Sequence, residues 1–208
     1  WVRSQVEVAS PRTPVELADG APVVLDPDGA AWADLTFDEV TAAALPGLLG
    51  ALTDPNLRAT VWITARNAVR QGTLDPALAV ELLAAGIPDE ELDAALSALG
   101  TWVGDDGHGA RGVVHEKLLP VLADPDAART RLHQAFLART ETAPPGSDLQ
   151  FAAATGAIRT GVDVDWLRSL LGGDLWPGIE LDSGLRWKVL QRLTSLAAVD
   201  LDLLDREL

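Results

Sequence analysis

The 208-residue sequence has no cysteine, no methionine and no tyrosine, and its only lysines are Lys117 and Lys188. Without cysteine there can be no disulfide, no thiolate metal site and no cysteine nucleophile, which fits a reducing cytoplasm. No apolar run approaches the roughly 20 residues of a membrane helix, and no signal-peptide pattern opens the chain. We therefore expect a cytoplasmic protein without a membrane partner. Because the chain starts at Trp1 and lacks methionine, we expect a fragment, a processed chain or an excised domain.

Acidic residues outnumber basic ones by 31 to 16, which gives a formal net charge of −15. Such a surface repels phosphate backbones, so we expect no nucleic-acid partner. Apolar residues make up 48% of the chain, which is typical of a packed protein and not of a disordered one.

Residues 1–35 differ in pattern from the rest of the chain. Val2, Ser4, Val6 and Val8 alternate with polar residues, as in a half-buried strand. Residues 23–25 and 31–35 flank a Pro-Gly turn at 26–29 and resemble the arms of a hairpin. We expect a short β segment over 1–35, either the end of a preceding β-sandwich or a hairpin packed on helices.

From Thr36 onward the pattern is helical. Thr36 and Glu39 form a capping box, Pro88 is placed to open a helix, and Asp-Pro or Ser/Asp caps precede several others. Short breaks between helices predict stacked antiparallel pairs. We predict a mainly α fold over 36–208, a HEAT/armadillo-like array (an α–α superhelix), and leave an irregular bundle open. The expected helices are 36–52, 55–71, 76–86, 88–103, 113–122, 125–139, 148–159, 163–171, 183–197 and 201–208.

The prediction of a helical array depends most on the amphipathic stretch 182–197, with Asp182 or Ser183 as its N-cap. Its apolar face must be covered by the preceding helices. We assign Trp187, Leu190, Leu193 and Ala197 to that face, widened by Leu185 and Val189, and expect Arg186, Lys188 and Arg192 to reach water.

The sequence offers one fragment of a metal motif. His115-Glu116 opens like the zinc-protease helix motif H-E-x-x-H, but Leu119 stands at the second ligand position. His108 and His133 have no partner at ligand spacing. We therefore predict no catalytic, cofactor-binding or metal-ligating residue in this chain, and we interpret the glycine-rich loop 104–112 as a mobile connection, with a ligand- or partner-contacting loop as the alternative.

Arginine supplies nearly all the positive charge. Most arginines should lie on solvated faces, while a few could line an inner surface and meet a substrate carboxylate. The arginines considered are at 66, 70, 129, 131, 139, 159, 168, 186 and 192. Tryptophans 62, 102, 166 and 187 lie in helical patterns and should wedge between helices, whereas those at 1, 32 and 176 could contact a neighbouring domain.

Three stretches carry a family resemblance. Residues 23–38 (VVLDPDGAAWADLTFD), 145–150 (PGSDLQ) and 182–193 (DSGLRWKVLQRL) together resemble the C-terminal part of aminopeptidase N-type zinc aminopeptidases, especially actinobacterial ones. The first is similar to the strand pair that ends a small β-sandwich in that family, and the other two lie within its helical domain.

The resemblance implies a non-catalytic C-terminal helical domain that caps the active-site chamber and controls peptide access. The parent would be a zinc metalloaminopeptidase that releases N-terminal amino acids, with its zinc in a catalytic domain outside these residues. Implied partners are the catalytic and β-sandwich domains of the same polypeptide, and peptide substrates. The family's H-E-x-x-H and G-x-M-E-N motifs are absent here. The alternatives are a free-standing helical-repeat scaffold that binds a protein partner, and an enzyme with an unrecognised site.

Overall fold

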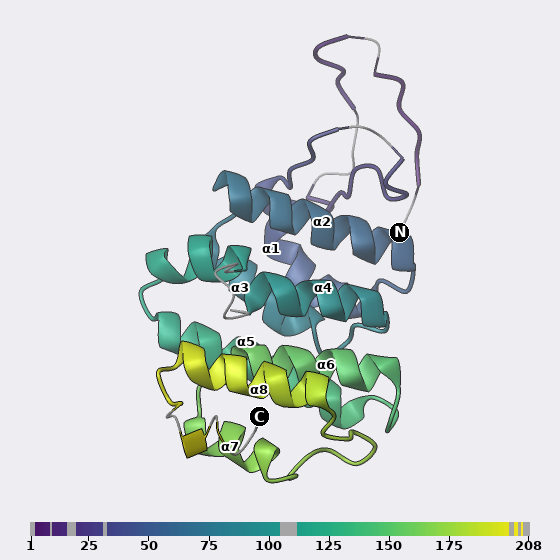
Figure 1. Cartoon of the computed structure of the whole chain (residues 1–208). Coiled ribbons are helices and arrows are strands. Elements are labelled where there is room, and N and C mark those ends of the chain that lie inside the picture. Colours follow the sequence, from purple (N-terminus) through teal and green to yellow (C-terminus); the bar gives the residue numbers. More distant parts are fainter. Residues whose placement is uncertain are drawn as a thin grey trace.

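The computed structural model describes residues 3–8, 10–15, 20–30, 33–104, 112–199, 202–203 and 205. Over this part the chain is mainly helical (Figure 1). The α-helices are α1 (Glu39–Leu48), α2 (Pro55–Gln71), α3 (Pro76–Gly86), α4 (Asp93–Val103), α5 (Pro125–Thr142), α6 (Asp148–Thr160), α7 (Val164–Leu171) and α8 (Ser183–Ser195). Short turns of other helix types are η1 (Leu49–Ala51), η2 (Val114–Leu118) and η3 (Leu119–Val121).

Local caps begin most helices where the sequence predicts. Asp54 accepts from the backbone N–H of Asn56 at 2.9 Å, and Pro55 follows as the first residue of α2. Equivalent side-chain caps begin α3, α5, α6, α7 and α8, at Asp75, Asp124, Ser147, Asp163 and Asp182. Gly72 ends α2 with a left-handed φ of 72°, a conformation that costs glycine little.

Two predicted helix starts and one predicted helix are wrong. The capping box at Thr36 does not form, because Asp38 caps α1 and accepts from Thr41 N–H at 2.8 Å. Pro88 does not open α4, which begins at Asp93, because the Glu90 carboxylate binds the next two N–H groups and competes with a helical start. Residues 113–122 form a π turn and a 3₁₀ turn, η2 and η3, in place of one α-helix.

The β segment predicted over 1–35 is not seen, since no strand occurs among described residues 3–8, 10–15 and 20–30. Val2, Ala31 and Trp32 lie outside the described residues. Val6 and Val8 are 42% and 78% exposed, so the apolar residues of this alternating pattern are not buried against another part of the described chain. The N–H of Val23 instead donates to the Thr41 hydroxyl of α1 at 2.7 Å. The turn at 26–29 is confirmed, with Gly29 N–H donating to Asp26 O at 2.9 Å.

Contacts connect alternate helices along the chain. Helix α3 packs on α1 and α5, while α6 packs on α4 and α8, and α5 and α6 also pack as a sequential pair. In Figure 1, α2, α4 and α6 follow one another down the molecule, with α8 below α4. One core cluster spans α1 to α6, and a second lies among α6, α7, α8 and the segments that follow α7 and α8.

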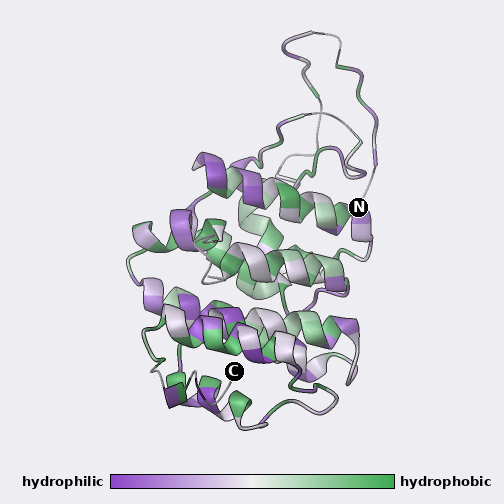
Figure 2. Cartoon of the chain, viewed as in Figure 1, coloured by the Kyte–Doolittle hydropathy of each residue, from purple (hydrophilic) through white to green (hydrophobic). Residues whose placement is uncertain are grey.

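Helix α8 buries a narrower face than predicted. Leu185, Val189, Leu190 and Leu193 are buried, but the Trp187 side chain is 47% exposed and Ala197 lies beyond the helix end. Arg192, expected in water, is buried instead. Figure 2 shows hydrophilic and hydrophobic residues mixed along α2 and α8.

Of the last predicted helix, Asp202, Leu203 and Asp205 are described and helical. None of the helices in the described ranges has the length and apolar character needed to cross a membrane.

Candidate functional site

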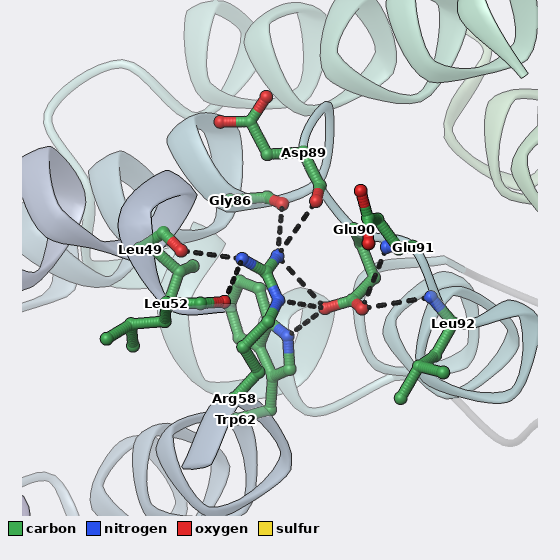
Figure 3. Close-up of polar contacts among 9 residues, drawn as sticks. All are labelled: Leu49, Leu52, Arg58, Trp62, Gly86, Asp89, Glu90, Glu91 and Leu92. Atoms are coloured by element: carbon green, nitrogen blue, oxygen red, sulfur yellow. Dashed lines mark hydrogen bonds and ion pairs between the residues drawn. The ribbon is translucent and has the colours of Figure 1, made fainter. Parts of the chain in front are cut away.

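A buried polar network joins α2 to the turn before α4 (Figure 3). Glu90 is fully buried, and its Oε2 accepts from Trp62 Nε1 at 2.7 Å and from Arg58 Nη2 at 3.2 Å and Nε at 3.3 Å. The other oxygen accepts from the N–H groups of Glu91 and Leu92 at 3.0 and 3.1 Å. The carboxylate is thus surrounded by donors on both oxygens, as a buried charge requires.

Arg58 also binds backbone carbonyls around it. Its Nη1 donates to the carbonyls of Leu49 at 2.5 Å and Leu52 at 3.5 Å, and its Nη2 to those of Gly86 at 3.5 Å and Asp89 at 3.2 Å. The Leu49 carbonyl lies in η1 and that of Leu52 directly follows it, while those of Gly86 and Asp89 lie at and after the end of α3. Carbonyl groups at a helix end have no hydrogen-bond partner within the helix. The guanidinium therefore holds together two segment ends, and we interpret this network as structural. No site prediction pointed to Arg58 or Glu90, although Arg58 directly follows Leu57 on the buried side of α2.

A second polar cluster surrounds a small cavity between η2, α5, α6 and α8. Four basic side chains line it, with apolar walls and one hydroxyl. The cavity volume is about 10 Å³, room for one water-sized group. No aspartate or glutamate of the described chain lines it. The lining residues are His115, Arg129, Arg159, Arg192, Thr160, Val103, Leu119 and Leu132.

Local structure fixes these cations in place. Arg192 is buried, and its Nε donates to Gly161 O at 2.7 Å while Nη1 donates to Ser195 Oγ at 3.0 Å. Arg159 Nη1 donates to Thr101 Oγ1 at 3.0 Å. Both lie in the last turn of their helices, α8 and α6, where the helix dipole favours positive charge. Arg129 pairs one turn back along α5, with Asp126 Oδ1 at 2.6 Å, and that aspartate is 87% exposed.

His133 lies close to this cluster, inside the α5–α6 interface. It is buried, its Nδ1 is 3.0 Å from Ala157 O, and its ring meets Trp166 edge-on with centroids 4.9 Å apart. Burial, and secondarily the charge of Arg192, lower the pKa of His133, although the Ala157 carbonyl and Asp163 act in the opposite direction. The ring is therefore neutral at pH 7, as an inter-helix packing residue.

The remaining predicted arginines fall mainly on the surface. Arg131 forms a two-contact ion pair with Glu81 across α5 and α3, and Arg66 lies 5.3 Å from the Trp102 ring centroid. The hydrogen bond from Arg131, aided by its charge, lowers the pKa of Glu81. The surface prediction thus fails for Arg192, whose side chain is buried.

An open groove of about 260 Å³ lies at the start of α1 and α3, beside Phe37 and Leu74. Its carboxylates belong to Asp38, Glu39 and Asp75. Two of these cap helices, and the hydrogen bond from Thr41 N–H lowers the pKa of Asp38. Helix capping accounts for this acidic groove.

The histidines do not gather into a metal centre in the described part of the chain. No group of three or more histidine, aspartate or glutamate residues there could hold a metal ion. His115 lies in the π turn η2 and His133 in α5, while His108 and loop residues 105–111 lie outside the described residues.

Comparison with known proteins adds one relative. No protein-family model matches the chain. Over 180 residues it is 28% identical to Aminopeptidase N of Streptomyces lividans. The chain is similar to part of an aminopeptidase. That match covers 85% of this chain and 20% of the aminopeptidase, so the chain spans about a fifth of the length of the curated relative it matches.

Proposed function

We propose that this chain is a non-catalytic helical domain of a zinc aminopeptidase of the aminopeptidase N type. The observation that carries the proposal is the match to Aminopeptidase N, which extends over most of this chain and only a fifth of the relative. The mainly helical fold agrees with a domain of helix pairs, which we propose to be HEAT-like. Zinc, the general base and the peptide bond to be cleaved would then belong to the rest of the polypeptide.

The work of such a domain is steric and electrostatic. A wall of packed helices over an active-site chamber would admit short peptides and exclude folded proteins. The net charge of −15 would attract basic peptides weakly, and salt would screen that attraction. The partners would be the catalytic and β-sandwich domains and the peptide substrate, in a cytoplasmic enzyme.

The reading frame and the full polypeptide test this proposal. We expect an H-E-x-x-H motif upstream of Trp1 in the same frame. Deleting this domain, or opening it with destabilising substitutions, should change the ratio of rates on long and short peptides while hydrolysis of aminoacyl-anilides is affected much less. A reading frame without the zinc motif, or a ratio that stays constant, would contradict the proposal.

A second candidate is a helical scaffold that binds a protein partner. It is favoured by the exposed aromatic side chains of Trp187 and Phe151, which are 47% and 39% exposed. A stable partner recovered with the chain, and lost on replacing Trp187 with alanine, would support this candidate if no zinc motif precedes Trp1.

A further inference from the structure

We propose that the exposed side of α2, together with Trp102 of α4, is a docking surface for an acidic segment of a protein partner. The surface consists of Ile63, Arg66 and Arg70 of α2 and of Trp102. None of these four residues belongs to the buried network around Glu90 or lines the small cavity. Binding at this surface does not depend on the aminopeptidase assignment.

The first support is the positive charge on this side of α2. The helix has three arginines and no acidic residue, in a chain whose formal net charge is −15. Arg58 is buried against Glu90, whereas Arg66 and Arg70 are exposed. Within the described ranges, neither exposed guanidinium forms an ion pair or a hydrogen bond to another side chain. Two like charges one helical turn apart repel each other, and carboxylates placed over them offset that repulsion.

The net negative charge of the chain does not cancel this local attraction. At physiological ionic strength the Debye length is about 8 Å, so more distant charges are largely screened. Asp34, which approaches the end of α2, accepts from Gln71 Nε2 at 2.6 Å and pairs with neither arginine. A carboxylate that reaches this surface therefore responds mainly to Arg66 and Arg70.

The second support is the contact between Arg66 and Trp102. The guanidinium carbon of Arg66 lies over the Trp102 ring, 5.3 Å from its centroid, which is within the range of a cation–π contact. A guanidinium stacked on an aromatic face keeps the N–H donors at its edge available, and these donors match the two oxygens of a carboxylate. The contact orients one binding group before a partner arrives, which lowers the entropy cost of binding.

The third support is the exposed apolar residue beside the arginines. Ile63 is 57% exposed and lies one turn before Arg66 on α2. Tryptophan and arginine are enriched among the residues that dominate binding at protein interfaces. Together these side chains favour a polypeptide that brings an apolar side chain as well as carboxylates.

The spacing along α2 defines the partner more closely. Arg66 and Arg70 are four residues apart, a rise of about 6 Å along the helix. In an extended segment, alternate side chains share one face and lie about 6.6 Å apart, so two glutamates with one residue between them meet both arginines. A leucine at the next alternate position meets Ile63. Nucleic-acid phosphates also offer paired anions, but the net charge of −15 repels a long polyanion.

An NMR titration of the 208-residue chain tests the surface. The probe is the N-acetylated, C-amidated peptide Leu-Ser-Glu-Ser-Glu-Ser-Leu, whose side-chain order is the same in both directions. We expect saturable shifts of the Trp102 indole N–H signal and of the Ile63 and Arg66 amide signals, and weaker binding as sodium chloride is added. The same peptide with glutamine in place of both glutamates should bind about tenfold more weakly, as expected for the loss of two exposed ion pairs.

Arginine substitutions provide the matched comparison. Arg66→Gln and Arg70→Gln should each weaken binding of the glutamate peptide about threefold. Arg168→Gln removes the same charge from α7, which Figure 1 places at the opposite end of the molecule from α2, and should leave the Kd almost unchanged. All three arginines are exposed, and circular dichroism checks that each variant keeps its fold.

Three results would overturn the proposal: shifts that do not saturate, equal binding of the glutamate and glutamine peptides, or equal weakening by Arg66→Gln and Arg168→Gln. Tighter binding of a short oligothymidylate than of the glutamate peptide would also overturn it, because the surface would then select phosphates over an acidic polypeptide.

Discussion

The guanidinium of Arg58 and the carboxylate of Glu90 form an ion pair that is removed from water almost completely. The two groups meet at 3.2 Å, with side-chain exposures of 7% and 1%. They are 32 residues apart in sequence and join α2 to the turn that precedes α4. Because each is the counter-charge of the other in an apolar interior, neither can be lost alone without cost.

Glu90→Gln should therefore destabilise the fold by about 3 kcal/mol, since it leaves the Arg58 charge buried without its counter-ion. The free energy of unfolding in urea measures the effect. Glu91→Gln is the control, because the same chemical change is made at the exposed neighbour and should cost less than about 0.5 kcal/mol. Equal stability of the two variants would show that the pair contributes nothing.

Trp62→Phe tests the contribution of Trp62, the third side chain of the Arg58–Glu90 network. It keeps an aromatic ring but removes the N–H that donates to Glu90, and we expect a loss of about 2 kcal/mol from the missing charged hydrogen bond and the smaller ring. Trp187→Phe makes the same change at a half-exposed position of α8 and should be close to neutral. Urea denaturation of the two variants side by side gives the comparison, and a neutral Trp62→Phe would remove the indole from the network.

Helices α5 and α6 approach each other closely at Gly156 of α6. A Cβ added there would lie 2.3 Å from Cδ1 of the buried Phe136 ring of α5, so Gly156→Ala should cost about 1–3 kcal/mol through overpacking. Gly47→Ala in α1 meets no atom within 4 Å and should be neutral or stabilise the chain by up to about 1 kcal/mol. Thermal unfolding separates the two, and a stabilised Gly156→Ala variant would mean that α5 and α6 lie further apart.

The lowered pKa of His133 predicts a pH effect on stability. The folded pKa lies below the unfolded value near 6.5, so the unfolded chain binds the proton more readily. This contribution to stability is complete above pH 6.5 and is lost as the pH falls from there through the folded pKa, with a slope of at most about 1.4 kcal/mol per pH unit.

Urea unfolding at pH 7.0 and 5.5 checks this effect, with His133→Gln as the comparison. The difference between the two pH values should shrink in the variant, because glutamine carries no titratable proton. The same decrease in the wild type and the variant would assign the pH dependence to other groups.

The sequence predicted those parts of the fold that are encoded locally. Asp54-Pro55 and Asp163 each supply a cap within three residues of the N–H groups they bind, so the beginnings of α2 and α7 follow from sequence. The alternation of valines with polar residues at Val6 and Val8 is also a local pattern. A strand, however, needs a second strand to pair with, and none is described beside these residues. The β prediction failed for that reason.

Neither polar cluster could be predicted in the same way. Glu90 directly follows Asp89 and precedes Glu91, which suggests a solvated acidic run, but in the fold it is buried against Arg58 and Trp62 of α2. The small cavity lined by Arg192 takes its four basic residues from four separate segments, and the position of Arg192 in the last turn of α8 resembles that of any surface arginine. Their proximity depends on how the helices pack, which composition and periodicity do not encode.

Hydrolysis of an aminoacyl-anilide by residues 1–208 alone, supplied with zinc and compared with the full polypeptide, tests the proposed division of labour most directly. We expect no turnover above the zinc blank from residues 1–208 and robust turnover from the full polypeptide. Zinc-dependent cleavage by residues 1–208 alone would place the chemistry inside this chain and contradict its role as a non-catalytic domain.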